Sequence, residues 1–316
     1  MNTSMNGLTV PDVSVGQRSP EKVKKLKRPG RWASYIMMGL VAVLVIQSVA
    51  TNPNFGWPIV GEYFASPRVL DGLVNTLQLT FIAMLLGVVL GVILAVMRLS
   101  TNPALYGAAG LYIWFFRGTP VFVQLLFWGF ISALYPTLAL GIPGAEPLFS
   151  TDTNSLITPV VAAILGLALN EAAYMAEIVR AGIVSVGKGQ TEAAHALGMS
   201  NMRTLRRVIL PQAMSVIVPP TANNVISMLK TTSLVSVLSF PELLYATQLI
   251  YAENFQTIPL LITASIWYLI GTTLRTIGQY YTERHYNKST RAQGLSIMRR
   301  FIELQKRRGT NDAPAR

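Results

Sequence analysis

The chain has 316 residues, of which 51% are hydrophobic and 13% charged, and its formal net charge is +12 at pH 7. This composition excludes an ordinary soluble domain, in which about a quarter of the residues would be charged. The absence of cysteine excludes disulfides and thiolate metal sites. Several apolar runs approach the roughly 20 residues that cross a bilayer as helix, whereas a barrel would show short alternating segments. We therefore predict an all-α integral membrane protein.

Charged residues mark the ends of the apolar segments and divide the chain into about six predicted transmembrane helices. Residues 104–116 are too short to cross a bilayer. We interpret them as an elbow near the cytoplasmic interface that ends at a bend around Arg117 and Pro120. The predicted spans are residues 32–50, 70–97, 121–140, 156–179, 211–229, with an interruption at Pro219 and Pro220, and 257–274.

The distribution of Lys and Arg predicts the orientation. Most of the 26 basic residues lie in the N-terminal tail, at Arg98, in residues 180–207 and in the C-terminal tail, whereas the loops on the other side hold only Arg68. Because basic residues are retained on the cytoplasmic side, we predict that both termini are cytoplasmic. The net charge follows from this topology and from contact with membrane lipid, so no nucleic acid partner is required. We interpret the first span as a retained signal anchor.

A polar, helix-prone stretch from Glu192 to Pro211, EAAHALGMSNMRTLRRVILP, separates two apolar spans. Ala193 and Ala194 favour a short helix, Glu192 suits the positive end of its dipole, and Gly198 is a natural stop. A second helix is predicted from about Asn201, with Arg203, Arg206 and Arg207 largely on one face; Pro211 either ends it or opens the next span. This arrangement is typical of a docking element.

The spacing of this stretch resembles the EAA loop of the membrane subunits of ABC importers. Glu192, Ala193, Ala194, Gly198, Leu210 and Pro211 fit that pattern, and Val208 stands where the family has isoleucine. The resemblance implies that the loop forms a coupling helix, which docks into a cleft of the ATP-hydrolysing subunit.

Further segments are similar to permeases of the polar amino acid uptake branch: GLVNTLQLT from Gly72, FFRGTPVFVQ from Phe115, NEAAYMAEIVRAGI from Asn170 and LKTTSLVSVLSFPEL from Leu229. The resemblance covers about residues 70–281 and implies a five-helix permease core. We expect the remaining domains to be a disordered basic cytoplasmic tail, 1–31, a transmembrane helix, 32–50, and a second basic cytoplasmic tail, 284–316. The last contains an amphipathic pattern that fits either a tail held near anionic lipid or a contact with the ATPase.

The partners that the resemblance implies are two copies of a cytoplasmic ATP-binding subunit, a second permease subunit, either the same chain or a homologue, and an extracytoplasmic solute-binding protein. The expected substrate is a polar amino acid, and the expected location is the bacterial cytoplasmic membrane. The chain has no phosphate-binding loop. We therefore expect no cofactor in this chain, no metal site and no enzymatic activity, with ATP and Mg²⁺ bound by the partner.

Five polar or charged residues within or beside the spans are candidates for the translocation path, because such groups usually face a protein interior or a wet pathway. For each, a structural alternative stays open: a bend for Arg117, helix packing for Glu171, snorkelling for Lys230 and satisfaction of freed backbone groups for the pair after the two prolines. These candidates are Arg117, Glu171, Asn223, Asn224 and Lys230. Glu177 is expected to pair with Arg180.

Two other functional classes remain to be compared. An ion-coupled secondary transporter or a channel would also show six spans with few charges, but it would need no EAA loop. A membrane enzyme would need a catalytic constellation, and the sequence contains neither H-E-x-x-H nor G-x-S-x-G. The sequence therefore favours a transport subunit that depends on a partner for ATP hydrolysis.

Overall fold

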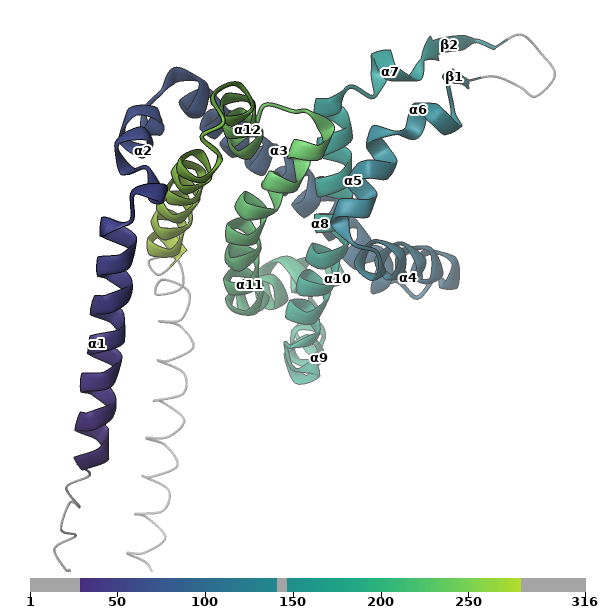
Figure 1. The fold of residues 1–316 in the computed structure, drawn as a ribbon. Coiled ribbons are helices and arrows are strands. Elements are labelled where there is room, and N and C mark those ends of the chain that lie inside the picture. Colours follow the sequence, from purple (N-terminus) through teal and green to yellow (C-terminus); the bar gives the residue numbers. More distant parts are fainter. Residues whose placement is uncertain (1–28, 141–146, 280–316) are drawn as a thin grey trace, which may run out of the picture. The chain divides into compact units, whose positions relative to one another are not determined.

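The protein consists almost entirely of helices in a computed structural model that describes residues 29–140 and 147–279 (Figure 1). The chain divides into two compact units, one ending at Phe55 and the other beginning at Gly56. The first unit contains α1 (Pro29–Thr51) and the short 3-10 helix η1 (Pro53–Phe55). Apart from the start of α1, both predicted basic tails lie outside the described residues.

The second unit contains all the remaining elements. Before α8 they are α2 (Trp57–Phe64), α3 (Pro67–Arg98), α4 (Pro103–Gly118), α5 (Val121–Gly129), α6 (Ile131–Leu134), β1 (Thr137–Leu140), β2 (Phe149–Asp152) and α7 (Thr153–Leu156). From α8 onward they are α8 (Pro159–Val184), α9 (Lys188–Ala196), α10 (Asn201–Thr204), the π-helix η2 (Leu205–Ile209), α11 (Leu210–Thr231), the 3-10 helix η3 (Thr232–Leu238), α12 (Leu243–Asn254) and a last helix, Thr257–Gln279.

Four of the described helices are long and apolar enough to cross a membrane: Ser34–Thr51, Pro67–Arg98, Pro159–Val184 and Thr257–Gln279. Two further pairs meet this criterion together but are bent, α4 with α5 by 99° and Asn201–Leu238 with α12 by 46°. If each bent pair is one span, the described chain has six. The prediction of an all-α membrane protein with about six spans is therefore confirmed, with the small antiparallel hairpin of β1 and β2 as an unpredicted addition.

The centre of the second unit is the close packing of α3 against α8. Two glycines on α3 make this possible: a Cβ atom at Gly87 would lie 2.8 Å from Glu171 Cβ, and one at Gly91 would lie 2.5 Å from Met175 Cβ. Small residues let two membrane helices approach until their backbones are nearly in contact. The contact with α3 thus fixes the position of the Glu171 side chain on one side.

The predicted third span, 121–140, is wrong in its second half. The helix after Pro120 ends at Gly129 and is followed by the four-residue α6 and then by β1. Glycine weakens a helix, and here it also admits a neighbour, because a Cβ at Gly129 would lie 2.4 Å from Leu238 Cδ2. A proline at 136 then prevents the helix from resuming. The predicted bend before this helix is confirmed by the 99° angle between α4 and α5.

The predicted interruption of the fifth span at Pro219 and Pro220 is also wrong, because α11 continues through both residues. Each proline removes one backbone N–H, but membrane helices tolerate this where other groups compensate. Beyond Lys230, α11 ends at Thr231 and is followed directly by the 3-10 helix η3.

The start of α12 is held by a buried carboxylate. Glu242 accepts hydrogen bonds from the backbone N–H groups of Leu244 at 2.9 Å and Tyr245 at 2.7 Å, and from the hydroxyl of Tyr268 at 2.8 Å. It therefore caps the helix and joins it to the last helix. The hydroxyl of Thr76 on α3 accepts from the Leu243 N–H at 3.0 Å. One short segment thus connects three helices.

Candidate functional site

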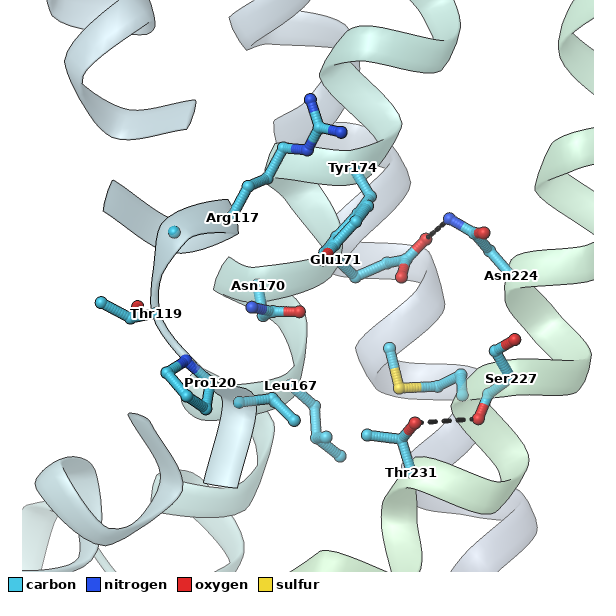
Figure 2. Close-up of a pocket in the computed structure, with 13 residues that line it drawn as sticks. Arg117, Thr119, Pro120, Leu167, Asn170, Glu171, Tyr174, Asn224, Ser227 and Thr231 are labelled. Atoms are coloured by element: carbon cyan, nitrogen blue, oxygen red, sulfur yellow. Dashed lines mark hydrogen bonds between the residues drawn. The ribbon is translucent and has the colours of Figure 1, made fainter. Parts of the chain in front are cut away.

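A cavity of about 560 Å³ lies between the α4–α5 bend, α8 and α11 (Figure 2). The bend contributes residues 117–121, α8 contributes a face that includes Asn170, Glu171 and Tyr174, and α11 contributes a face that includes Asn224. Its volume is in the range of small-molecule sites in proteins. Of the five residues that we expected along the path, the structure brings Arg117, Glu171 and Asn224 together here.

Glu171 is the buried acid of this cavity, with 6% of its surface exposed. Its Oε1 accepts a hydrogen bond from Asn224 Nδ2 at 2.8 Å, and no other hydrogen bond to its carboxylate is found among the described residues. It lies about halfway along α8, roughly 18 Å from each end at 1.5 Å per residue. Glu171 thus packs against α3 and also lines the cavity.

Arg117 supplies the opposite charge. It is the penultimate residue of α4 and is exposed, and its guanidinium lies 5.2 Å from the ring centroid of Tyr174, within the range of a cation–π contact. Arg117 makes no ion pair in the part of the chain that the structure describes. The cavity thus presents one cation and one carboxylate that are not paired with each other.

The bend that carries Arg117 is held by two side-chain amides that the sequence analysis did not single out. Gln124 Nε2 donates to the carbonyls of Phe116 and Thr119, both at 3.0 Å. Asn170 Nδ2 donates to the same Phe116 carbonyl at 2.8 Å. The signal was available in the sequence, since Pro120 lacks the N–H that Phe116 would bond in a continuous helix, and Gln124 is the single polar residue of VFVQLLFWG.

Two other expected path residues lie elsewhere. Asn223 is exposed on α11 and accepts a hydrogen bond from Gln279 Nε2 at 2.9 Å. Lys230 is exposed near the end of α11 and is not among the residues that line the cavity. The expected pair of Glu177 and Arg180 is confirmed, with Nη2 and Oε2 2.8 Å apart.

The Glu192–Pro211 stretch forms a helix, a tight turn and a second helix. The first helix, α9, begins at Lys188 rather than near Glu192 and ends as expected before Gly198, whose φ of 73° is left-handed. The N–H of Gly198 donates to the His195 carbonyl at 2.9 Å, and that of Met199 to the Ala194 carbonyl at 3.0 Å. These two bonds define a Schellman motif, in which glycine avoids the steric cost of a left-handed residue.

Ala193 and Ala194 lie on different faces of this first helix. Ala194 is buried, whereas Glu192 and Ala193 are exposed. Beyond the turn, Arg203 is also exposed, and two apolar side chains stand out in solvent, Leu197 at 82% and Met202 at 72% exposure. The loop thus presents both basic and apolar groups on its outer surface.

The second helix passes through Pro211 rather than ending there. Leu210 begins α11, and Pro211 follows at its first turn, directly after the π-helical turn η2. Pro211 cannot donate to the carbonyl four residues earlier, and a local change of helical register next to proline is a common way of accommodating this loss. The helix therefore continues from Asn201 into the membrane-spanning segment without a break.

The comparison with protein families identifies the class of protein that this fold and loop define. A family model described as the binding-protein-dependent transport system inner membrane component matches residues 87–288. The chain belongs to this family and is a membrane-spanning permease subunit of an ABC importer, as the resemblance of the EAA loop led us to expect. It is thus a multi-pass membrane protein. Among the described residues, no group of three or more His, Asp or Glu side chains is placed to hold a metal ion.

Two relatives show the similarity in more detail. The arginine transport system permease protein ArgU of Corynebacterium glutamicum is 47% identical over 283 residues, which cover 89% of this chain and 87% of that one. The probable amino-acid ABC transporter permease protein YckA of Bacillus subtilis is 35% identical and covers 77% of this chain and 98% of its own length.

Solved structures agree with this assignment. The chain is similar to a crystal structure of an amino acid ABC transporter with histidines, with a TM-score of 0.59, 35% identity and coverage of 69% of this chain and 94% of that one. An inward-facing form of the MetNI methionine ABC transporter matches with a TM-score of 0.55 at 20% identity, and this second likeness concerns the fold alone.

Proposed function

We propose that this permease moves a polar amino acid that carries a positive charge, and that the cavity beside Glu171 holds the substrate during its passage. The observation that carries the proposal is the buried Glu171, whose Oε2 has no partner among the described residues and which lies beside a cavity of about 560 Å³. A buried carboxylate is costly unless it is paired, so a cationic ligand would find a strong partner there.

The cavity also fits the rest of an amino acid. Arg117 is available for the α-carboxylate, and Asn224 and Thr231 add uncharged polar groups along the α11 wall. Arginine combines a carboxylate with two cationic groups, and the 47% identical relative is named as an arginine permease. Arginine is therefore the first substrate to test, with neutral amino acids as the comparison.

The coupling loop and the topology complete the proposal. The basic segments would lie in the cytoplasm of a bacterium, with α9 and its Schellman turn docked on the ATPase. Glu192, Ala193, Gly198 and Arg203 would belong to that contact, and the segment from Leu210 and Pro211 would transmit the movement into α11. Two permease subunits, two ATPases and an extracytoplasmic binding protein would form the complex, and ATP would bias the path between its inward and outward states.

Reconstitution into liposomes tests the proposal. We expect uptake of labelled arginine to require ATP, the separate ATPase and the binding protein. Gly198→Val should abolish uptake, because a β-branched residue is strained at a positive φ, while the amount of permease in the membrane stays the same. Gly189→Ala is the matched control on α9, since a Cβ at Gly189 meets no atom within 4 Å.

The alternative of an ion-coupled transporter or a channel makes the opposite prediction. Uptake that continues under an ion gradient without the ATPase would contradict the proposed coupling. Uptake that needs ATP but carries only neutral amino acids would leave the coupling in place and contradict the assigned substrate.

A further inference from the structure

The α4–α5 bend leaves backbone groups without their helical partners, and side chains from two helices supply the missing hydrogen bonds. A bend of 99° between two helices breaks the helical hydrogen bonds, so the freed backbone groups need other partners. The carbonyl of Phe116 is the group most affected, because its helical donor would be residue 120, which is proline. A carbonyl that is shielded from water and left without a donor destabilises the fold.

Two side chains from different helices meet at this one carbonyl. Gln124 on α5 is 5% exposed and reaches back to Phe116 O at 3.0 Å, while Asn170 on α8 reaches across to it at 2.8 Å. The two amides also contact each other, since Asn170 Nδ2 lies 3.3 Å from Gln124 Oε1. Gln124 further bonds the hydroxyl of Thr119 at 2.8 Å, so both sides of the bend are tied to one side chain.

The Phe116 carbonyl lies directly before Arg117, the residue that brings a positive charge to the cavity. It belongs to the peptide group that joins Phe116 to Arg117, so whatever holds it also fixes the point from which the Arg117 side chain starts. Asn170 is the neighbour of Glu171 on α8 and lines the cavity with it. The same contacts therefore fix the spacing between the cationic and the anionic side of the cavity.

We propose that Gln124 and Asn170 are positioning residues that hold Arg117 opposite Glu171 and thereby set the affinity of the cavity for its substrate. This inference rests on the proposed function of the cavity. The amide groups of Gln124 and Asn170 act by holding the bend in place, and they do not donate hydrogen bonds to the ligand. Positioning of this kind acts on binding geometry, so its loss appears in KM more than in the amount of folded protein.

The variants Gln124→Met and Asn170→Ala each remove one donor to the Phe116 carbonyl, the first with little change in length. The chain has no native cysteine, so Gly118→Cys places a single thiol on the cavity wall, where a Cβ meets no atom within 4 Å. Its rate of reaction with a charged, water-soluble thiol reagent reports the geometry of the bend without any transport measurement. Thr263→Val is the matched control, because that buried hydroxyl bonds a carbonyl in the last helix, away from the cavity.

We expect each variant to change the labelling rate at Gly118→Cys by at least about threefold and to raise KM for arginine uptake about tenfold, while the control changes neither. Combining either variant with Arg117→Gln should raise KM by less than the product of the separate effects, because both act through Arg117. Unchanged labelling in both variants would overturn the positioning role. The labelling rate could change in both variants while KM stays the same in them and in Arg117→Gln. That result would overturn the assignment of the cavity as the substrate site and not the positioning role.

Discussion

Two buried glutamates of this permease show how differently one side chain can be used in an apolar protein. Glu242 is fully buried, and both its oxygens are occupied, by two backbone N–H groups and the Tyr268 hydroxyl. Glu171 is almost as buried at 6% exposure, yet a single bond from Asn224 occupies only one of its oxygens. A saturated carboxylate holds structure together, whereas one with a free oxygen beside a cavity retains the capacity to bind.

The contacts around Glu242 and Glu171 differ in the same way. The segment around Glu242 is anchored on α3, where Asn75 Nδ2 donates to the Pro241 carbonyl at 2.8 Å. Glu171 has the tightly packed Gly87 behind it and the cavity in front of it. Its position is thus fixed by packing on one side only, which leaves the other side available for a ligand.

The largest effect is expected from Glu242→Ala, because it leaves three partly buried donors, which Glu242 now accepts from, without an acceptor. At about 1–3 kcal/mol for each unsatisfied group, the loss of stability is roughly 3 kcal/mol or more. The melting temperature of the detergent-solubilised protein and its level in the membrane measure this loss. Glu62→Ala, at an exposed position on α2, is the control. An unchanged melting temperature for Glu242→Ala would remove the distinction between the two glutamates.

Glu171→Gln should affect transport rather than stability. The amide keeps the shape of the side chain and can still accept from Asn224, but it loses the charge. A hydrogen bond to a charged group is worth about 1.5–3 kcal/mol, so KM for arginine should rise roughly 10-fold to 150-fold. Uptake kinetics with saturating binding protein give KM and kcat separately. A large fall in melting temperature with an unchanged KM would mean that Glu171 is as structural as Glu242.

Gly87→Ala tests the packing behind Glu171. The added methyl group would lie 2.8 Å from both Cβ and Cγ of Glu171, so α3 and α8 must move apart or the glutamate must shift. Overpacking of this kind costs about 1–3 kcal/mol, and the shift should raise KM as well. Gly107→Ala on α4 is the matched control, since nothing lies within 4 Å of its Cβ and the helix should gain about 0.5–1 kcal/mol. Equal behaviour of the two variants would contradict the close contact.

Much of this architecture could be predicted from the sequence, because long apolar runs and their flanking charges have few alternative interpretations. The end of the short helix in the Glu192–Pro211 stretch was equally predictable, since Gly198 specifies the stop, although α9 begins earlier than expected, at Lys188. The end of the third span was not predicted, because the apolar run continues past Gly129, and the close approach of Leu238 to this glycine is a contact that the sequence does not show.

The cavity was only partly predictable for a related reason. A lone acid such as Glu171 attracts attention in any apolar run, but Asn223 and Asn224 look alike in the sequence, and only the rotation of α11 decides which of them faces the cavity. Glu242 was overlooked because it lies in a predicted loop, where an acid is unremarkable. Its role depends on Tyr268, which is distant in the sequence and reaches it only in the folded chain.

The smallest effect is expected from Arg68→Gln, which breaks the ion pair with Glu253. These two side chains are 2.9 Å apart and join the start of α3 to the end of α12, so the pair resembles the Glu242 network in the helices that it connects. Its side chains are 51% and 66% exposed, and exposed pairs contribute only about 0–1 kcal/mol and are screened by salt. The melting temperature of this variant should therefore differ little from that of the parent. The difference should be smaller at high ionic strength than at low ionic strength. A loss comparable to that of Glu242→Ala would mean that charge, rather than burial and saturation of the acceptor, anchors α12.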